Sequence, residues 1–301
     1  MAESTPGTTA SAVAPTESAG TGPVTAPAAD PNAVYALGSS RGESARLERQ
    51  ADELAPESAA LLDRVGLGAG DRALDLGCGP RGLLEMLSER VTPSGWVVGI
   101  DADPAHVAMA SELAARLGLE NVEVRCADAR RTGLGSGVFD VAHARLLLVT
   151  VPEPAEVLAE MVRLTRPGGW VAGLEADTEH AVCYPPHPAF DRLCEIFTVA
   201  FTRNGASPHL GRRMSELYRR AGLHHIGIEA WSPVYPPGHS RRTVRADLVR
   251  SMRPQILDMG LADEAELDEL DAAARRHFAD PETVVMPGLM FLAWGRKSAA
   301  G

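Results

Sequence analysis

The strongest structural signal in this chain is the run Leu74-Asp75-Leu76-Gly77-Cys78-Gly79-Pro80-Arg81-Gly82. Apolar residues at 72–76 predict a short buried strand, and the leucines at 83, 84 and 87 predict a helix. Glycine between them permits a tight turn and lets a ligand approach the backbone. The run therefore predicts a strand–turn–helix unit with a ligand at the turn.

Strands and helices alternate on the C-terminal side of this unit. Further strands are expected at 96–100, 122–126, 139–144 and 170–175, with helices at 103–118 and 155–164 and a turn at Pro167-Gly168-Gly169. Such alternation indicates a parallel sheet with helices on both faces. The predicted fold class is α/β, doubly wound.

The flanking regions are less regular. Residues 1–32 are rich in Ala, Thr, Pro, Gly and Ser, which predicts a disordered tail, and residues 42–65 predict two short helices broken at Pro56. The remainder predicts helices at 188–204, 211–221, 243–259 and 263–278, and strands at 226–231 and 288–295.

Composition narrows the class of protein. The 301 residues are 45% hydrophobic and carry 29 basic against 40 acidic side chains, a net charge of −11, which argues against nucleic-acid and anionic-membrane partners. No apolar run reaches the roughly 18 residues of a membrane span, and no secretory signal is visible. Four cysteines without CxxC spacing favour a reduced cytoplasmic protein with no metal site.

Two acids follow the next strands of the predicted sheet. Asp101 ends the second strand, where a carboxylate can accept both hydroxyls of a ribose, and Asp128 ends the third. In an open parallel sheet these strand ends face the same crevice as the glycine turn. The sequence therefore predicts a nucleotide cofactor in that crevice.

Two cofactor classes fit this arrangement. Gly77-x-Gly79-x-x-Gly82 matches the dinucleotide fingerprint, with Asp101 near the expected ribose position, so an NAD(P)-dependent oxidoreductase is one hypothesis. Asp75 beside the turn suits a ligand ammonium group better than a pyrophosphate. Pro80 lacks the N–H that a pyrophosphate needs, and Asp128 suits an adenine amino group.

The run at 74–79 resembles the first motif of class I S-adenosylmethionine-dependent methyltransferases. The similarity continues through Asp101, residues 127–129, 139–140 and 167–169, and covers about 34–177. Among these enzymes the chain is most similar to small-molecule methyltransferases of bacterial secondary metabolism. The resemblance implies a Rossmann-like seven-stranded sheet, order 3-2-1-4-5-7-6, with the last strand antiparallel. Arg81 stands where the family usually has glycine, which leaves the turn geometry open.

The resemblance also implies roles for individual residues. The turn Gly77-Cys78-Gly79 would frame the methionine portion of the cofactor, and Asp75 would lie near its amino group. Asp101 would hold the ribose with Ala102 beside the adenine, while Asp128 and the Ala129 N–H would bind the adenine. Tyr35 and Gln50, in the N-terminal helical segment, are expected at the methionine end.

Methyl transfer from a sulfonium is an in-line displacement that depends on positioning and often on removal of a proton. The family places a residue close to the transferring methyl at the position of Arg145, whose guanidinium could anchor a carboxylate of substrate or cofactor. His143, Glu175, Asp177 and His180 are alternative general bases; a strand histidine pointing into the helix layer is the competing interpretation of His143.

Two insertions, at about 180–208 and 232–286, are expected to form helical lids on a domain spanning 33–301. Six aromatic residues could line an apolar pocket there or simply belong to the core: Tyr184, Phe190, Phe197, Phe201, Trp231 and Tyr235.

The expected function is S-adenosylmethionine-dependent methylation of a small molecule, at oxygen on frequency alone. Three alternatives remain. One is a protein that binds the same cofactor but catalyses a cyclisation or rearrangement, another is the oxidoreductase, and the most remote is a nucleic-acid methyltransferase. The sequence leaves monomer and homodimer open.

Overall fold

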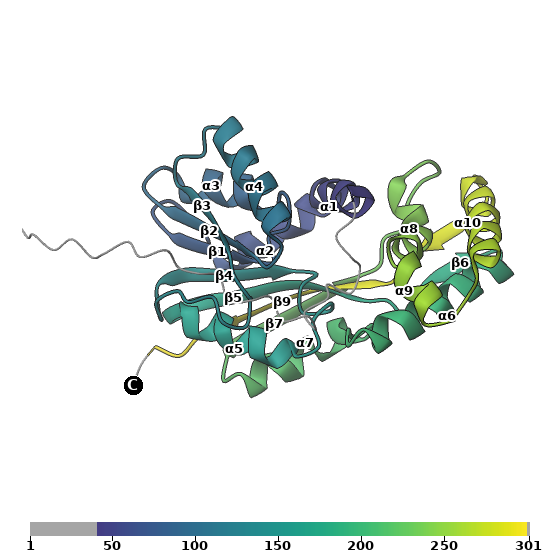
Figure 1. Ribbon diagram of the computed structural model, residues 1–301. Coiled ribbons are helices and arrows are strands. Elements are labelled where there is room, and N and C mark those ends of the chain that lie inside the picture. Colours follow the sequence, from purple (N-terminus) through teal and green to yellow (C-terminus); the bar gives the residue numbers. More distant parts are fainter. Residues whose placement is uncertain (1–40, 300–301) are drawn as a thin grey trace, which may run out of the picture. The chain divides into compact units, whose positions relative to one another are not determined.

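The computed structural model describes residues 41–299. Its centre is a seven-stranded sheet, drawn in Figure 1. The strands are β1 (Arg72–Leu76), β2 (Trp96–Asp101), β3 (Val122–Cys126), β4 (Phe139–Arg145), β5 (Thr165–Asp177), β7 (His224–Trp231) and β9 (Leu289–Arg296). The expected tail at 1–32, the boundary at 33 and Tyr35 lie outside the described residues.

The strand order is β3-β2-β1-β4-β5-β9-β7. The first five strands pair in parallel, and β9 runs antiparallel to both β5 and β7. Two further strands, β6 (Val182–Tyr184) and β8 (Val284–Met286), form a separate small sheet. With these two left out of the numbering, the order is 3-2-1-4-5-7-6, so the predicted topology is confirmed.

Helices cover both faces of the sheet (Figure 1). Around the sheet they are α1 (Arg41–Glu53), α2 (Ala55–Val65), α3 (Leu84–Val91), α4 (Pro104–Arg116), α5 (Pro154–Leu164) and α7 (Leu210–Arg220). Helices α2, α3 and α4 share one apolar cluster with the sheet, and α5 and α7 share the other. Because helices cover both faces, the central strands are apolar along their length instead of alternating.

Successive residues of β1 show this directly. Ala73 packs in the cluster with α2 and α3, whereas Leu74 and Leu76 pack in the cluster with α5 and α7. All three side chains are fully buried. Asp75 lies on the Ala73 face, so the only charged residue of the strand interior points toward the N-terminal helices.

The remaining helices lie beyond the carboxyl ends of the central strands (Figure 1). They are α6 (Pro188–Arg203), η1 (Ser240–Thr243), α8 (Val244–Ser251), α9 (Arg253–Asp258) and α10 (Glu264–Ala279). Helix α6 packs against α8, α9 and α10, so the two predicted insertions contact each other. That they act as lids is still a prediction.

The segment 243–259 is not the single helix that its apolar pattern predicted. Helix α8 ends at Ser251 and α9 begins at Arg253, with Pro254 near its start. Proline lacks the N–H of a helix interior and its ring clashes with the preceding turn, so it divides the helix.

The fifth strand begins earlier than predicted. Thr165 already pairs with Phe139, and the expected turn Pro167-Gly168-Gly169 lies inside β5, where the register shifts. A Cβ at Gly169 would lie 2.7 Å from the Asp140 carbonyl oxygen, so glycine is required for the close approach.

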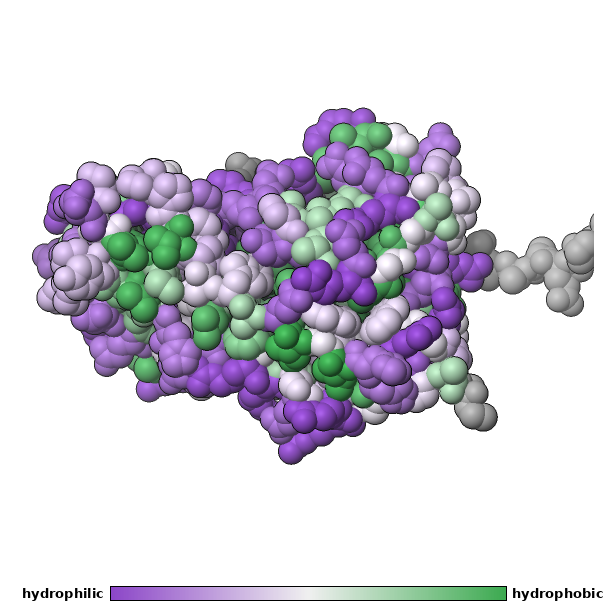
Figure 2. All heavy atoms as spheres, turned by 180° about the vertical axis from the view of Figure 1, so that it is seen from behind, coloured by the Kyte–Doolittle hydropathy of each residue, from purple (hydrophilic) through white to green (hydrophobic). Residues whose placement is uncertain are grey.

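The surface carries apolar groups in several places. On the face seen in Figure 2, hydrophobic atoms form separate groups among hydrophilic side chains. Exposed large apolar residues include Val182, Tyr184 and Val284 of the small sheet. No helix between residues 41 and 299 has the length and apolar character that crossing a membrane requires. All four cysteines are free thiols.

Candidate active site

The glycine turn is tied to the second strand through backbone hydrogen bonds. The N–H groups of Gly77 and Cys78 donate to the Ile100 carbonyl at 2.7 and 3.0 Å. Gly77 and Gly79 have φ of 67° and 60°, a region that glycine adopts without strain. Arg81, the departure from the family pattern, pairs with Asp52 of α1 at 2.9 Å. The turn therefore connects the sheet to α1.

Asp101 organises the same turn. Its Oδ2 accepts from the Gly79 N–H at 2.7 Å, and its Oδ1 accepts from the Asp103 N–H at 2.9 Å. The hydrogen bond that Asp101 accepts from His106 raises the pKa of this histidine, whose Nδ1 lies 3.5 Å from Oδ1 of Asp101. The first two predicted motifs are thus brought together, and a ribose bound to Asp101 would share its oxygens with these amides.

Asp128 lies two residues beyond the end of β3, with Ala129 beside it, and the Ala127 N–H donates to the Asp101 carbonyl at 3.0 Å. The Asp128 carboxylate accepts from the Arg130 backbone N–H at 2.8 Å and from the guanidinium of Arg130 at 2.7 Å. These hydrogen bonds lower the pKa of Asp128. Its side chain is still 46% exposed, so a ligand amino group can reach it. Ala102, expected beside the adenine, is also exposed.

Asp75 is buried against β4. Its Oδ1 lies 2.9 Å from Nδ1 of His143, and its Oδ2 accepts from the Leu83 N–H at 2.9 Å. The His143 ring is fully buried between β1 and the helix layer. An ammonium group at Asp75 would share oxygens that already have partners. The general-base role of His143 stays a prediction, and the geometry shows a buried His–Asp pair.

Glu175 holds the segment that follows β4. Its two oxygens accept from the backbone N–H groups of Leu147, Leu148 and Val149 at 2.9–3.2 Å. Burial raises the pKa of Glu175 to about 8, although these hydrogen bonds oppose the shift. The carboxyl thus fixes the backbone of residues 147–149, and its role as a base stays a prediction.

Arg145, at the end of β4, points toward α1 and α2. Its Nη1 donates to the Ala51 carbonyl at 3.4 Å and to Oγ of Ser58 at 3.3 Å. Burial lowers the pKa of this guanidinium. Gln50, one turn of α1 beyond Arg46, is 8% exposed and accepts from Arg46 at 2.7 Å.

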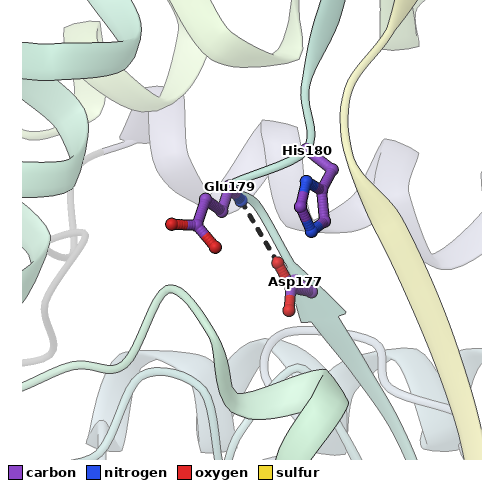
Figure 3. Close-up of side chains that lie close together, drawn as sticks. All are labelled: Asp177, Glu179 and His180. Carbon is purple, nitrogen blue, oxygen red and sulfur yellow. Dashed lines mark hydrogen bonds between the residues drawn. The ribbon is translucent and has the colours of Figure 1, made fainter.

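His180 belongs to a polar cluster at the end of β5. Figure 3 shows Asp177 at the tip of the strand, with Glu179 and His180 on the segment that leaves it. The ligand atoms of these three residues lie within 4.8 Å of one another. The guanidinium of Arg212 contacts all three, including Glu179 at 2.6 Å and His180 at 3.0 Å. An arginine therefore supplies the positive charge that a metal ion would bring.

A pocket opens between the carboxyl ends of β4 and β5 and the helices beyond them. Its empty volume is about 770 Å³, counting space open to solvent. Apolar side chains form much of its wall, including Leu146, Val149, Phe197, Phe201, Val244, Leu248 and Met290. Polar lining comes from Arg46, Gln50, Thr150, Asp177, Thr178, Tyr235, Arg241 and Arg245. Such a pocket suits a small organic molecule.

The predicted residues divide into those that line this pocket and those that support it. Gln50, Asp177, Phe197, Phe201 and Tyr235 line it. Among the described candidates, Arg145, His143, Glu175 and His180 do not line the pocket, and Phe190 packs in the core against Phe278. Tyr184 is 66% exposed.

Arg241 and Arg245 were missed by the sequence analysis. They lie four residues apart, which places them on one side of the η1–α8 segment, and both are more than 90% buried. The sequence shows their four-residue spacing, but it does not show that both side chains are buried in the pocket wall.

Comparison with known proteins agrees with this geometry. Residues 73–169 match the family described as methyltransferase domain. Nocamycin O-methyltransferase from Saccharothrix syringae is 42% identical over 115 residues, 38% of this chain and 41% of that protein. Aklanonic acid methyltransferase DauC from Streptomyces sp. (strain C5) is 27% identical over 178 residues, 59% of this chain and 70% of that protein. The first relatives are matched over about half of their own length.

Solved structures show the same fold. The [4+2]-cyclase SpnF superposes with a TM-score of 0.50 at 20% identity, covering 81% of each chain. Phosphoethanolamine N-methyltransferase 2 of Haemonchus contortus, solved with S-adenosyl-L-methionine, gives 0.52 at 18% identity, covering 81% of this chain and 52% of that one. S-adenosylmethionine is the cofactor of the matched family. Residues 73–169 therefore carry a methyltransferase domain, and the motifs and sheet order of the chain are similar to those of class I S-adenosylmethionine-dependent methyltransferases.

Proposed function

We propose that this protein transfers the methyl group of S-adenosylmethionine to an oxygen of a small, largely apolar molecule of secondary metabolism. The supporting observation is that the glycine turn adjoins the pocket. A Cβ at Gly77 would lie 2.8 Å from Cδ1 of Leu147, and the neighbouring Leu146 lines the pocket. On the other side, Leu47 of α1 approaches Gly79 while Gln50 of the same helix lines the pocket.

The proposal assigns the cofactor to the crevice along β1, β2 and β3. The turn Gly77-Cys78-Gly79, with Asp75 behind it, takes the methionine end, and Gln50 approaches from α1. Asp101 takes the ribose hydroxyls. The adenine lies between Ala102 and Ala129, with its amino group on Asp128. This orientation directs the methyl group toward β4 and the pocket.

The chain supports catalysis by positioning. An in-line displacement requires the acceptor atom, methyl carbon and sulfur to be aligned in a site that excludes water. Glu175 fixes the backbone of 147–149, which separates turn and pocket, and Arg145 ties β4 to α1 and α2. We propose both as positioning residues. Acceptance at oxygen is supported by the similarity to nocamycin O-methyltransferase.

The first experiment is calorimetric titration of the purified protein with S-adenosylhomocysteine, with NADH and NADPH in parallel. Binding of S-adenosylhomocysteine alone is the expected result. Binding of a nicotinamide cofactor alone would instead require the oxidoreductase interpretation of Gly77–Gly82.

The fold is also compatible with a different function, because the [4+2]-cyclase SpnF shares it over 81% of this chain. The mass of the product separates the two functions. Methyl transfer adds one methylene mass to the substrate, whereas a cyclisation or rearrangement leaves the mass unchanged.

A further inference from the structure

Four charged side chains line the pocket, and they differ in whether a group of opposite charge lies beside them. Arg46 is held by Glu43, and Arg241 lies 3.8 Å from a carboxylate oxygen of Glu53. Asp177 is paired with Arg212. These three charges are therefore balanced by groups of the protein itself, which leaves Arg245 as the fourth.

Arg245 is 3% exposed and has no carboxylate partner among the residues that the structure describes. Its Nη2 donates to the Thr178 carbonyl at 3.0 Å, and the guanidinium carbon lies 4.3 Å from the centroid of the Phe197 ring. Its Nε and Nη1 have no hydrogen-bond partner in the described part of the chain.

Neighbouring groups that could balance this charge are otherwise engaged. Asp247, on the same helix, binds Arg250 and Arg275 at 2.7 Å. Cys194 lies close to Arg245, but burial raises the pKa of its thiol, so it is neutral at pH 7. Because arginine stays protonated in proteins, a full positive charge lies in the pocket wall with no carboxylate partner between residues 41 and 299.

We propose that the substrate is a small, largely apolar organic acid whose carboxylate binds Arg245. This inference rests on the proposed function and names its substrate class. A buried cation without a partner is unfavourable, and a ligand anion restores the balance. The apolar wall from α6 and α8 fits the body of such a molecule. The pocket wall has one positive charge in excess, that of Arg245, which matches a monocarboxylate and not a doubly charged phosphate monoester.

The test uses two probes of the same shape, 2-naphthoate and 2-naphthamide, titrated into protein saturated with S-adenosylhomocysteine. Wild-type protein is expected to bind the naphthoate more tightly, by about tenfold or more. Arg245→Met should abolish this preference, and Arg245→Lys should keep part of it. Arg220→Met is the matched control, because Arg220 is 73% exposed on α7 and should leave the preference unchanged.

Thermal unfolding of the same variants separates a ligand-binding arginine from a structural one. Removal of an uncompensated buried charge should leave the melting temperature of Arg245→Met equal to or above that of the wild type. A clearly lower melting temperature, or equal affinity of the two probes for wild-type protein, overturns the proposal. The proposed function fails separately, if S-adenosylhomocysteine itself does not bind.

Discussion

Asp101 makes the most direct connection between sequence motif and site chemistry. One oxygen accepts from the Gly79 N–H and the other from the Asp103 N–H, so the carboxylate is fixed at the end of β2. A fixed acceptor pays little ordering entropy when a ligand binds. The same geometry makes its removal a test of both turn structure and cofactor binding.

Asp101→Ala is expected to weaken S-adenosylhomocysteine binding by about 100-fold or more, about 2.7 kcal/mol, because the ribose hydroxyls lose their acceptor. Calorimetric titration measures the affinity, and circular dichroism checks that the variant is folded. Asp63→Ala serves as the control, since the Asp63 side chain is 65% exposed on α2 and pairs with Arg90. Unchanged affinity in Asp101→Ala would remove this residue from the cofactor site.

Among single residues, the sequence predicted those whose place in the site is set by the strand or turn next to them. Asp101 and the glycines follow predicted strands, so their placement in one crevice could be deduced. Arg245 could not be recognised, because its significance depends on which acids are already paired. The ion pair of Arg241 with Glu53, for example, joins residues that are far apart in the sequence.

Among the elements, the turn after β1 uses its glycines for different purposes. A Cβ at Gly82 would lie 2.6 Å from Oδ2 of Asp75 and 2.7 Å from the Cys78 carbonyl oxygen. Within the described part of the chain, a Cβ at Gly79 would meet nothing nearer than Cδ1 of Leu47, at 4.0 Å. Gly82 is therefore required by the packing of the protein itself, whereas space at Gly79 is available to a ligand.

Alanine substitution should separate these two roles. Gly82→Ala is expected to lower the free energy of unfolding by about 2–4 kcal/mol, from the left-handed backbone and the clash with Asp75. Gly79→Ala should cost only about 1–2 kcal/mol of stability but reduce S-adenosylhomocysteine affinity about tenfold. Urea denaturation and calorimetry measure the two effects. Equal stability losses with unchanged affinity at Gly79 would contradict a cofactor at this turn.

The segment after β4 depends on Glu175 in a way that pH can reveal. The pKa of this carboxyl rises from 4.5 to about 8 in the folded protein. Between these values the folded state holds a proton that the unfolded state lacks, so stability should fall as pH rises. The slope cannot exceed about 1.4 kcal/mol per pH unit for one group.

Glu175→Gln removes this titration and should flatten the dependence of unfolding free energy on pH between about 5 and 8. Urea denaturation at several pH values measures it, with Glu216→Gln as the control, because the Glu216 side chain on α7 is 42% exposed. A wild-type profile that rises across this window relative to Glu175→Gln would contradict burial as the dominant influence on this carboxyl.

Element boundaries were predictable where the signal was local. Pro56 lies at the start of α2, so the expected break between two N-terminal helices is confirmed. The small sheet β6–β8 was not predicted, because its strands are three residues long and pair across about a hundred residues of sequence. Pairing of that kind leaves almost no periodic signal.

For the whole molecule, the sheet order followed from local alternation plus the family resemblance, whereas the pocket depended on packing between distant segments. Its wall combines α1, the ends of β4 and β5, α6, α8 and the start of β9. Those segments meet only in the folded chain. Ligands bound at this junction should therefore stabilise the folded state as a unit.

This coupling can be measured as a shift in unfolding. S-adenosylhomocysteine at about 100 times its dissociation constant should raise the free energy of unfolding by about 2.7 kcal/mol, since the crevice formed by β1, β2 and β3 is absent in the unfolded chain. For a domain of this size the melting temperature should rise by about 5–10 °C. NADH at the same concentration should give no shift, and Asp101→Ala should lose most of the shift. A similar rise with NADH would mean that the glycine turn binds a dinucleotide.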